Sequence, residues 1–412
     1  MQEQPPASVK RPQARVATKF PWGCPAAAVV SAVLAPFLGM IGFPTALAEP
    51  SQPLLEIPPE LQLSPLPARA PENPGNPANA DKIELGRLLF FDPILSADGN
   101  VACATCHHPG LGWSDGRPTP IGVDGVGLGP LRLPRGTSGT PLPERNTPGL
   151  VNVVFNGVLT GRIASPERAP MFWDSRVQSL EVQALIPIEN RGEMRGESCP
   201  ESEGVPRAVD RIRKIAEYRE RFTRIFGGPP DTSVHATNLA RALAVFERSL
   251  VAPNTPLDRF LAGDAEALSP QQRAGLREFQ DSGCILCHGG PMLSDFKLHV
   301  LGVPDSSAGG RRSFRTPTLR QLQETAPYMH NGRYRTLDAV LQFYEETADA
   351  AGEARDGGDT SLQPPLDPLL AQLRMNPARI GDLKVFLESI QDDHYDRTIP
   401  LRVPSGLPVA GR

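Results

Sequence analysis

The 412-residue sequence is poor in cysteine, in aromatic residues and in net charge. Aromatic residues make up 6% of the chain, and there are only six cysteines. The formal charge of −4 argues against nucleic acid as a partner, because that would need a basic stripe. Beyond residue 48 no stretch approaches the ~20 consecutive apolar residues that a membrane-spanning helix needs. We therefore expect no nucleic-acid partner and no membrane span in the mature chain.

Prolines and glycines are abundant, at 46 and 38 residues, so the chain is rich in turns and loops. Prolines are densest in residues 49–79, which we expect to form an extended tether rather than a folded element. The chain that remains after the signal segment is too long for one small cytochrome and fits two domains on the usual scale of ~150 residues each.

Four of the six cysteines lie in two Cys-x-x-Cys-His pentapeptides, Cys103–His107 and Cys284–His288. This motif is typical of c-type haem attachment, in which the thiols bond to the porphyrin and the histidine binds the iron. The alternative is a zinc or redox Cys-x-x-Cys beside a chance histidine, and two copies with the same spacing argue against it. The sequence predicts two covalent haems, held by Cys103, Cys106 and His107, and by Cys284, Cys287 and His288.

The two remaining cysteines are Cys24 and Cys199. Cys24 lies in a segment that we expect to be removed from the mature chain. Since the motif thiols bind haem, Cys199 has no partner, and the sequence predicts no disulfide framework. A lone thiol of this kind is either a partly buried bystander or a site of oxidation.

The N-terminus has the order of a secretory signal. Four basic residues precede an apolar run from about residue 26 to residue 47, which ends in Ala-Leu-Ala before Glu49. An uncleaved membrane anchor is the alternative, but Pro36 and Pro44 interrupt the run and favour cleavage. Because covalent haem attachment takes place outside the cytoplasm, export agrees with the two motifs. We predict a signal peptide at residues 1–48 and a periplasmic mature protein.

Each haem motif is expected to lie between two helices. Residues 81–90 precede the first motif, and residues 269–279 precede the second, with Ser269 placed to cap that helix. Amphipathic segments at 236–251 and 378–390 close the two halves. A helix before the motif and another after the haem loops is the plan of a cytochrome c domain.

These features predict a mainly α, loop-rich fold with two cytochrome c-like haem domains side by side. The expected segments after the signal are the proline-rich tether (49–79), an N-terminal haem domain (80–255), a C-terminal haem domain (256–400) and a tail (401–412).

The two halves contain a repeat between the haem motifs and the closing helices. Residues 172–181 align without a gap to residues 329–338, and the same register places Pro187 opposite Tyr344. A tyrosine phenolate binds ferric iron, whereas a proline side chain has no donor atom. If this position overhangs the haem in both halves, the second iron is capped by Tyr344 and the first is open. The alternative is that Tyr344 is a core aromatic residue.

Two ordered blocks of sequence, residues 172–194 and 325–332, resemble the bacterial dihaem cytochrome c peroxidase superfamily. The similarity extends over residues 80–400, and it is strongest to the MauG-like branch. In the peroxidases the second iron is bound by a methionine where Tyr344 stands, and in the MauG-like branch it is bound by a tyrosine. The resemblance therefore implies that Tyr344 is an iron ligand.

The resemblance also implies catalytic roles for residues of the first block. Glu193 corresponds to the distal carboxylate that moves the peroxide proton, and Gln183 corresponds to the amide beside it. Cleavage of hydrogen peroxide needs such a base and acid. Trp173 matches a redox-active tryptophan between the haems, with aromatic packing as the alternative role. Arg176 is either an added positive charge or part of an ordinary salt bridge.

A calcium site between the haems is implied by the resemblance alone. Its ligands would be Asn146, Thr325 and Pro327, which offer an amide oxygen and backbone carbonyls, the hard oxygen ligands that calcium prefers. The implied cofactors are thus two haems c and one Ca²⁺.

The sequence departs from the family pattern in two places. No histidine occurs between His108 and His235, where peroxidases that need reductive activation carry a removable distal histidine. The first iron is therefore expected to be open without prior reduction. Ser282 stands where MauG has a tryptophan that passes electrons to its protein substrate, which puts that route in doubt here. The loops 118–145 and 157–170 look longer than the family minimum and are candidates for controlling access or docking.

Together these observations predict a periplasmic dihaem oxidoreductase that reacts with hydrogen peroxide at the His107 haem. It would oxidise an electron donor or protein substrate through a high-valent dihaem state, which the Tyr344 phenolate stabilises. One alternative is a conventional cytochrome c peroxidase that detoxifies peroxide with electrons from a small cytochrome c or cupredoxin. Another is a non-enzymatic electron carrier with two six-coordinate irons, against which the missing distal histidine argues.

Overall fold

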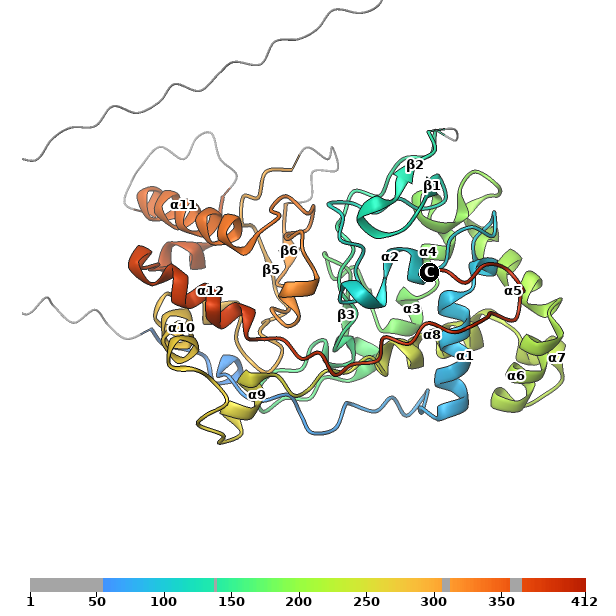
Figure 1. The fold of residues 1–412 in the computed structure, drawn as a ribbon, viewed down its shortest axis with the longest axis horizontal. Helices are drawn as coiled ribbons and strands as arrows, with labels where there is room; N and C mark the ends of the chain where they lie inside the picture. Colours follow the sequence, from blue (N-terminus) through green and yellow to red (C-terminus); the bar gives the residue numbers. More distant parts are fainter. Residues whose placement is uncertain (1–54, 137–138, 306–311, 356–364) are drawn as a thin grey trace, which may run out of the picture. The chain divides into compact units, whose positions relative to one another are not determined.

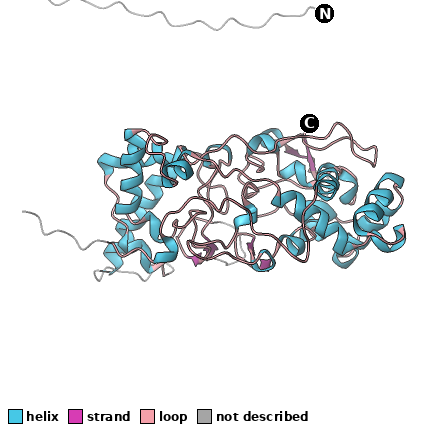
Figure 2. Ribbon diagram, turned by 90° about the horizontal axis from the view of Figure 1, so that it is seen from below, coloured by secondary structure: helices cyan, strands magenta, loops and turns pink. Residues whose placement is uncertain are grey.

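The structure is a computed structural model that describes residues 55–136, 139–305, 312–355 and 365–412. The predicted signal peptide and Cys24 lie outside the described residues. The described part is mainly helical and rich in loops, as predicted (Figure 1). Figure 2 shows how much loop connects the helices. None of the described helices is long and apolar enough to cross a membrane.

The helices of the first half are α1 (Ala80–Phe91), α2 (Cys103–Cys106), α3 (Leu180–Gln183), α4 (Ile186–Glu189), α5 (Gly204–Arg213), α6 (Ala216–Phe226), α7 (Pro230–Ser233) and α8 (Ala236–Arg248). Those of the second half are α9 (Pro256–Leu261), α10 (Pro270–Asp281), α11 (Leu337–Arg355) and α12 (Ile380–Glu388).

Three short antiparallel strand pairs occur in the described residues. They are β1 (Gly125–Val126) with β2 (Leu133–Pro134), β3 (Pro170–Met171) with β4 (Val177–Gln178), and β5 (Leu298–His299) with β6 (Phe314–Arg315).

The predicted helices before and after each haem motif are present, and they cross at glycines. A Cβ atom on Gly86 of α1 would lie 2.1 Å from the carbonyl oxygen of Ala242 in α8. A Cβ atom on Gly275 of α10 would lie 2.0 Å from the carbonyl oxygen of Asp382 in α12. Both pairs of helices therefore pack backbone against backbone, which only glycine allows. Ser269 caps α10 as predicted, because its hydroxyl accepts the Gln272 amide at 3.1 Å.

Each helix pair lies within its own hydrophobic core. The first core includes Leu85 and Leu89 of α1 with Leu243 and Phe246 of α8. The second core is built in the same way around α10 and α12. The described residues nevertheless belong to one compact unit, so the two cores are parts of a continuous structure.

The predicted repeat is also a structural repeat. Met171 pairs with Val177 in the first copy, and Tyr328 pairs with Tyr334 at the corresponding positions of the second copy. The residue that follows Met171 and the residue that follows Tyr328 both have a positive φ, which is 66° at Phe172 and 70° at Met329. The gapless alignment of these segments is therefore confirmed by their backbone conformations. After this turn the first copy continues into α3 and α4, and the second continues into α11.

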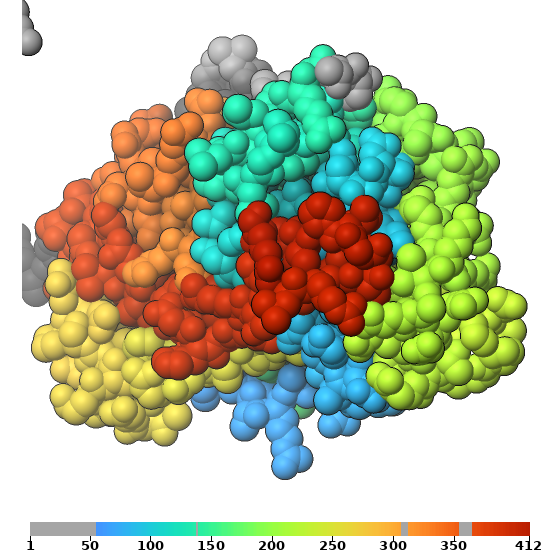
Figure 3. All heavy atoms as spheres, turned by 45° about the vertical axis from the view of Figure 1, so that its right-hand side comes forward, coloured from blue at the N-terminus to red at the C-terminus, as the bar shows by residue number. Residues whose placement is uncertain are grey.

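The C-terminal segment returns from α12 to the first half. The Ala410 amide donates to the Phe91 carbonyl at 3.1 Å, and the Ser405 hydroxyl donates to Asp92 at 2.6 Å. In Figure 3 this segment lies across the surface of the first half. Residues 401–412, expected to be a tail, are thus packed on α1 and the loop that follows it.

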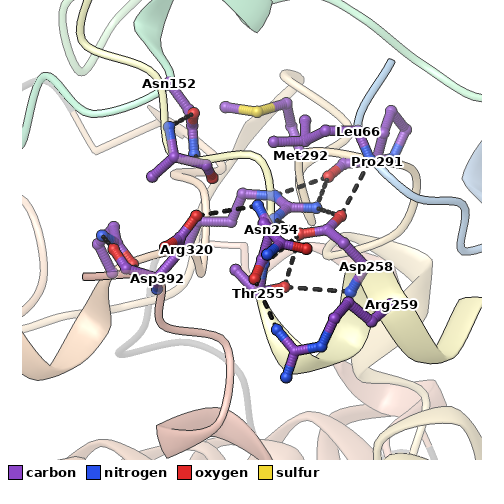
Figure 4. Close-up of polar contacts among 12 residues, drawn as sticks. Leu66, Asn152, Asn254, Thr255, Asp258, Arg259, Pro291, Met292, Arg320 and Asp392 are labelled. Carbon is purple, nitrogen blue, oxygen red and sulfur yellow. Dashed lines mark hydrogen bonds and ion pairs between the residues drawn. The ribbon is translucent and has the colours of Figure 1, made fainter. Parts of the chain in front are cut away.

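A buried ion pair fixes the N-terminal segment to the second half (Figure 4). Arg320 makes two contacts of 2.8 Å with the Asp258 carboxylate and also donates to the Pro291 carbonyl. The same carboxylate accepts the Leu66 amide at 3.0 Å. The expected tether, as far as it is described, therefore packs against the protein, and its regular structure is one short turn at Pro59–Leu61.

Candidate functional site

One cavity of about 1300 Å³ is lined by residues of both halves. It is larger than a usual ligand pocket of ~300–1,000 Å³. Every residue that the sequence predicted for haem attachment, catalysis or calcium binding lines it. These residues are Cys103, Cys106, His107, Asn146, Trp173, Gln183, Glu193, Cys284, Cys287, His288, Thr325, Pro327 and Tyr344.

In both motif histidines, Nδ1 lies within hydrogen-bond distance of a backbone carbonyl oxygen. Nδ1 of His107 lies 2.8 Å from the Trp113 carbonyl oxygen, and Nδ1 of His288 lies 3.0 Å from the Leu293 carbonyl oxygen. Trp113 and Leu293 both have positive φ, 59° and 52°, which turns each carbonyl towards its histidine. A neutral imidazole that donates through Nδ1 keeps its lone pair on Nε2, the arrangement typical of a metal ligand.

Burial disfavours the charged forms of both imidazoles and of three motif thiols, those of Cys103, Cys106 and Cys284. It lowers the pKa of His107 to about 4 and also lowers the pKa of His288. Burial raises the pKa of Cys106 to about 12 and that of Cys284 to about 11. Four thiols and two neutral imidazoles on the wall of a large, mostly apolar cavity fit two covalently attached haems.

Glu193 lies in a single π-helical turn, Arg191–Arg195, and faces the cavity. Burial raises its pKa to about 7, although the charge of Arg176 acts in the opposite direction. A neighbouring loop fixes the backbone at this point: the Val123 amide donates to the Glu193 carbonyl at 3.0 Å. A Cβ atom on Gly122 would lie 2.2 Å from the same carbonyl oxygen, so the loop approaches this closely only because residue 122 is glycine.

Gln183 and Pro187 lie on the same wall as Glu193. Gln183 is the last residue of α3, and Pro187 is in the first turn of α4. Within the described part of the chain, the Gln183 amide group has no hydrogen-bond partner, so it is available to a ligand in the cavity. Pro187 presents only carbon atoms there.

Tyr344 reaches the cavity from α11 on the side of the second haem motif. Burial raises the pKa of its phenol, and the nearby thiols of Cys287 and Cys284 act in the same direction. Its hydroxyl has no hydrogen-bond partner among the described residues. The raised pKa keeps this phenol protonated in the protein without haem.

Trp173 connects the two halves. Its indole N–H donates to the Asn146 carbonyl at 2.8 Å, and its own carbonyl accepts the Arg315 amide at 2.6 Å. Arg176 lies over the Phe172 ring at 3.8 Å and forms a 2.8 Å ion pair with Asp174. Arg176 thus forms an ordinary salt bridge, and its positive charge also acts on the Glu193 carboxyl.

Asn146 and Thr325, two of the three residues implied for calcium binding, lie at contacts between the two halves. The Asn146 amide donates to the His330 carbonyl at 2.8 Å, and the Asn146 side chain donates to the Arg117 carbonyl at 2.7 Å. A Cβ atom on Gly112 would lie 2.8 Å from Cγ2 of Thr325. The contact between the two halves is therefore tight at this place.

Sequence reasoning missed a buried carboxyl in the first half of the cavity. Glu247 of α8 is 5% exposed and lines the cavity, and burial raises its pKa to about 8. Its carboxyl group has no hydrogen-bond partner in the described residues. Since Phe246 and Phe386 pack against equivalent glycines, Glu247 corresponds to Leu387 in the second half. A charged residue on the apolar face of the predicted helix 236–251 was the available signal.

His299 lies beside the second motif between two carboxylates. Its ring nitrogens are 3.0 Å from Asp295 and 2.6 Å from Asp367. These contacts raise the pKa of His299 to about 11 despite burial. The ligand atoms of Cys287, Asp295 and His299 lie within 4.8 Å of one another. Because Cys287 belongs to a haem motif, we treat this group as part of the haem pocket.

Comparison with known proteins identifies the family. Residues 80–266 match the family described as di-haem cytochrome c peroxidase. The chain is 31% identical over 347 residues to the methylamine utilization protein MauG of Methylorubrum extorquens, a match that covers 81% of this chain and 85% of that protein. The chain belongs to the di-haem cytochrome c peroxidase family. It is therefore an oxidoreductase with haem cofactors, hydrogen peroxide as oxidant and a redox protein as partner.

The relatives of this chain within the family include both MauG proteins and cytochrome c peroxidases. The cytochrome c551 peroxidase of Pseudomonas aeruginosa is 35% identical over 298 residues, which are 67% of this chain and 75% of that protein. Two solved structures share the fold. A MauG-like protein associated with microbial copper homeostasis superposes with a TM-score of 0.61 at 23% identity, covering 80% of this chain and 95% of that one. The diheme peroxidase BthA of Burkholderia thailandensis superposes with a TM-score of 0.58 at 20% sequence identity, covering 84% of this chain and 92% of that one.

Proposed function

We propose that this protein is a periplasmic, MauG-like dihaem c-type oxidoreductase that reacts with hydrogen peroxide at the haem of the first motif. The observation that carries the proposal is the difference between Pro187 and Tyr344, which occupy equivalent positions and line the same cavity. One position offers no ligand atom and the other offers a phenol. The predicted signal peptide at residues 1–48 supports the periplasmic location.

The haems, when bound, supply the redox chemistry and store the two oxidising equivalents of one peroxide molecule. Cys103, Cys106 and His107 hold the first haem, and Cys284, Cys287 and His288 hold the second. The Trp113 and Leu293 carbonyls orient the two histidines so that each Nε2 is free for iron.

Glu193 moves the proton of the peroxide. Its pKa of about 7 allows the carboxylate to take the proton from one peroxide oxygen and to return it to the departing oxygen at neutral pH. Gln183 orients the peroxide through its free amide group. Pro187 keeps the wall beside them apolar and would offer no ligand atom to the iron of a haem held by the first motif.

Tyr344 would bind the iron of the second haem through its phenolate oxygen. A metal cation in front of the phenol favours its ionised form. The anionic ligand stabilises a higher iron charge than the neutral thioether of methionine would. This ligand would therefore disfavour uptake of electrons from a high-potential cytochrome.

Trp173 and the calcium site lie between the haems in this proposal. Trp173 passes electrons from one half to the other, which its hydrogen bonds to Asn146 and Arg315 support. The side-chain oxygen of Asn146 and the carbonyls of Thr325 and Pro327 bind one Ca²⁺. The ion would hold the contact between the halves in place.

A conventional cytochrome c peroxidase is the second candidate function. The 35% identity to a cytochrome c551 peroxidase favours it. Such an enzyme would take electrons from a small cytochrome c or cupredoxin and would need rapid turnover with that donor.

The deciding experiment mixes the diferric protein with hydrogen peroxide in a stopped-flow spectrometer, without prior reduction. We expect an immediate spectral change, a persistent oxidised state and slow oxidation of reduced cytochrome c. Inertness until half-reduced, together with fast cytochrome c turnover, would support the conventional peroxidase instead.

A further inference from the structure

Trp113 lies directly behind His107 and is not used by the proposed function beyond its backbone carbonyl. The indole is fully buried among Phe90, Phe91 and Phe246, with ring centroids at 5.6, 6.0 and 5.7 Å. Its carbonyl accepts the His107 Nδ1 hydrogen bond at 2.8 Å. An oxidisable aromatic ring therefore lies next to the ligand of the first haem.

The indole of Trp113 is linked to the C-terminal segment. Its N–H donates to the Asp396 carbonyl at 3.2 Å. The preceding residue, Tyr395, is buried in the same hydrophobic core as Trp113. The two oxidisable side chains thus lie in one packed cluster, although they are far apart in sequence.

Tyr395 has a proton acceptor. Its hydroxyl donates to one carboxylate oxygen of Glu324, and Arg397 binds the other oxygen. The guanidinium of Arg397 lies over the tyrosine ring at 4.4 Å. The Arg397 side chain is 36% exposed and that of Glu324 is 18% exposed, so this group reaches the surface. Burial raises the pKa of Tyr395, so the phenol keeps its proton until it is oxidised.

Among the described residues of the second half, no such arrangement lies behind the motif histidine. Leu293 takes the place of Trp113 behind His288, and an aliphatic side chain is not redox-active. A path of this kind therefore begins at the first haem alone.

We propose that Trp113 and Tyr395 form an electron relay between the His107 haem and the surface at Glu324 and Arg397. The relay rests on the proposed function, because the oxidant is the first haem after its reaction with peroxide. A one-electron donor, such as a redox protein, would dock at the surface end.

The electrons and protons of the relay balance. The oxidised haem takes one electron from Trp113, whose indole keeps its proton because a backbone carbonyl is not a base. Tyr395 then reduces the Trp113 cation and passes its phenol proton to the Glu324 carboxylate. The donor at the surface finally gives one electron to the Tyr395 radical, and the proton returns from Glu324.

The test uses the holoprotein, carrying ring-deuterated tyrosine, with hydrogen peroxide and no donor. Samples are frozen at short times for EPR, and peptides are mapped by mass spectrometry for oxidised residues. We expect a tyrosyl signal narrowed by the deuterium and oxidation at Trp113 and Tyr395. Tyr395→Phe should lose the tyrosyl signal and leave a tryptophan signal, and Trp113→Phe should lose both.

Tyr218 provides a matched control. It is also buried in the first core and donates to a carboxylate, Asp92, at 2.7 Å, but it does not adjoin the Trp113 hydrogen bond. Tyr218→Phe should keep the full signal. If Tyr218→Phe removes the tyrosyl signal and Tyr395→Phe keeps it, the relay is wrong.

The outcomes separate this proposal from the function on which it rests. A spectral change of the haem with peroxide, but no radical or oxidation at Trp113 or Tyr395, overturns the relay alone. Absence of any spectral change in the wild-type protein overturns the proposed function and the relay with it. Haem content and circular dichroism show whether each variant is folded. If Trp113→Phe does not fold, the mapping of oxidised residues in the wild-type protein decides whether the relay exists.

Discussion

Pro187 and Tyr344 occupy equivalent positions in the two halves of this protein, and both line one cavity. Each is eight residues beyond the hydroxyl residue that caps its helix, Ser179 in the first copy and Thr336 in the second. The two copies share the same turn before the cap, so the difference lies in the side chain and not in the register. One repeated sequence segment thus carries a side chain without a donor atom in the first half and a phenol in the second.

Haem stoichiometry checks the architecture. The mature protein should carry two haems that survive denaturation, because thioether bonds hold them. Intact mass spectrometry should show a gain of two haems, and the double variant Cys103→Ala, Cys106→Ala should gain only one. A single haem in the wild-type protein would contradict the two-haem architecture.

Replacement of Glu193 should slow the reaction with peroxide. Glu193→Gln removes the proton carrier, and we expect a rate lower by about 10²-fold or more, the usual effect of losing a general acid–base group. In the wild-type protein the carboxylate is the base, and its pKa is about 7. The rate should therefore fall as the pH is lowered through 7, and Glu193→Gln should lose this dependence.

Glu197 is the control for that experiment, since it is half-exposed and pairs with Arg191 at the surface. Glu197→Gln should react with peroxide at the wild-type rate and keep the pH profile. Equal slowing of both variants would mean that the effect is structural and not due to proton transfer at Glu193.

Glu247 should make the stability of the protein depend on pH. Its folded-state pKa of about 8 lies above the ordinary value of 4.5 for glutamate. Between these values the unfolded chain releases a proton that the folded protein retains, so stability falls as the pH rises from about 4.5 to about 8. Glu247→Leu, which copies Leu387 of the second half, should be more stable at pH 8 by about 1–3 kcal/mol.

Thermal unfolding of the holoprotein at several pH values measures this effect. The difference in Tm between Glu247→Leu and the wild type should grow with pH. A variant that is less stable than the wild type at every pH would show that the carboxyl has a partner in the holoprotein.

The Asp258–Arg320 pair should be important for stability. Asp258→Ala leaves the Arg320 guanidinium buried without its partner, which costs about 3–5 kcal/mol. The exposed pair of Asp81 and Arg224, with charged atoms 3.6 Å apart, is the control. Asp81→Ala should cost at most about 1 kcal/mol. Thermal unfolding of both variants compares them, and similar losses would contradict the importance of the buried pair.

The features carried by local sequence could be predicted. The Ser269–Pro270 pair located a helix start, and both Cys-x-x-Cys-His segments, which the sequence predicts to attach haem, line the large cavity. The repeat places Tyr344 opposite Pro187 in the sequence register. The structure brings all the predicted site residues to one cavity. Family resemblance was needed for Glu193 and Gln183, because nothing in their local sequence marks a peroxide site.

The features that depend on contacts distant in sequence could not be predicted. The Trp113 carbonyl is directed at His107 by a positive φ that the sequence does not reveal. Gly122 is required because its loop, which is distant from Glu193 in the sequence, packs directly against the Glu193 backbone. The packing of the C-terminal segment on α1 likewise depends on the tertiary structure, since its sequence has no regular period.

The bond between Tyr344 and the second iron is the central claim, and resonance Raman spectroscopy tests it most directly. Excitation into the tyrosinate-to-iron charge-transfer band of the diferric protein should give tyrosinate ring modes that shift with ring-deuterated tyrosine. These modes should disappear in Tyr344→Phe, which should still carry two haems through its thioether bonds. Tyrosinate modes that persist in Tyr344→Phe, or a wild-type protein with no such modes, would contradict the account.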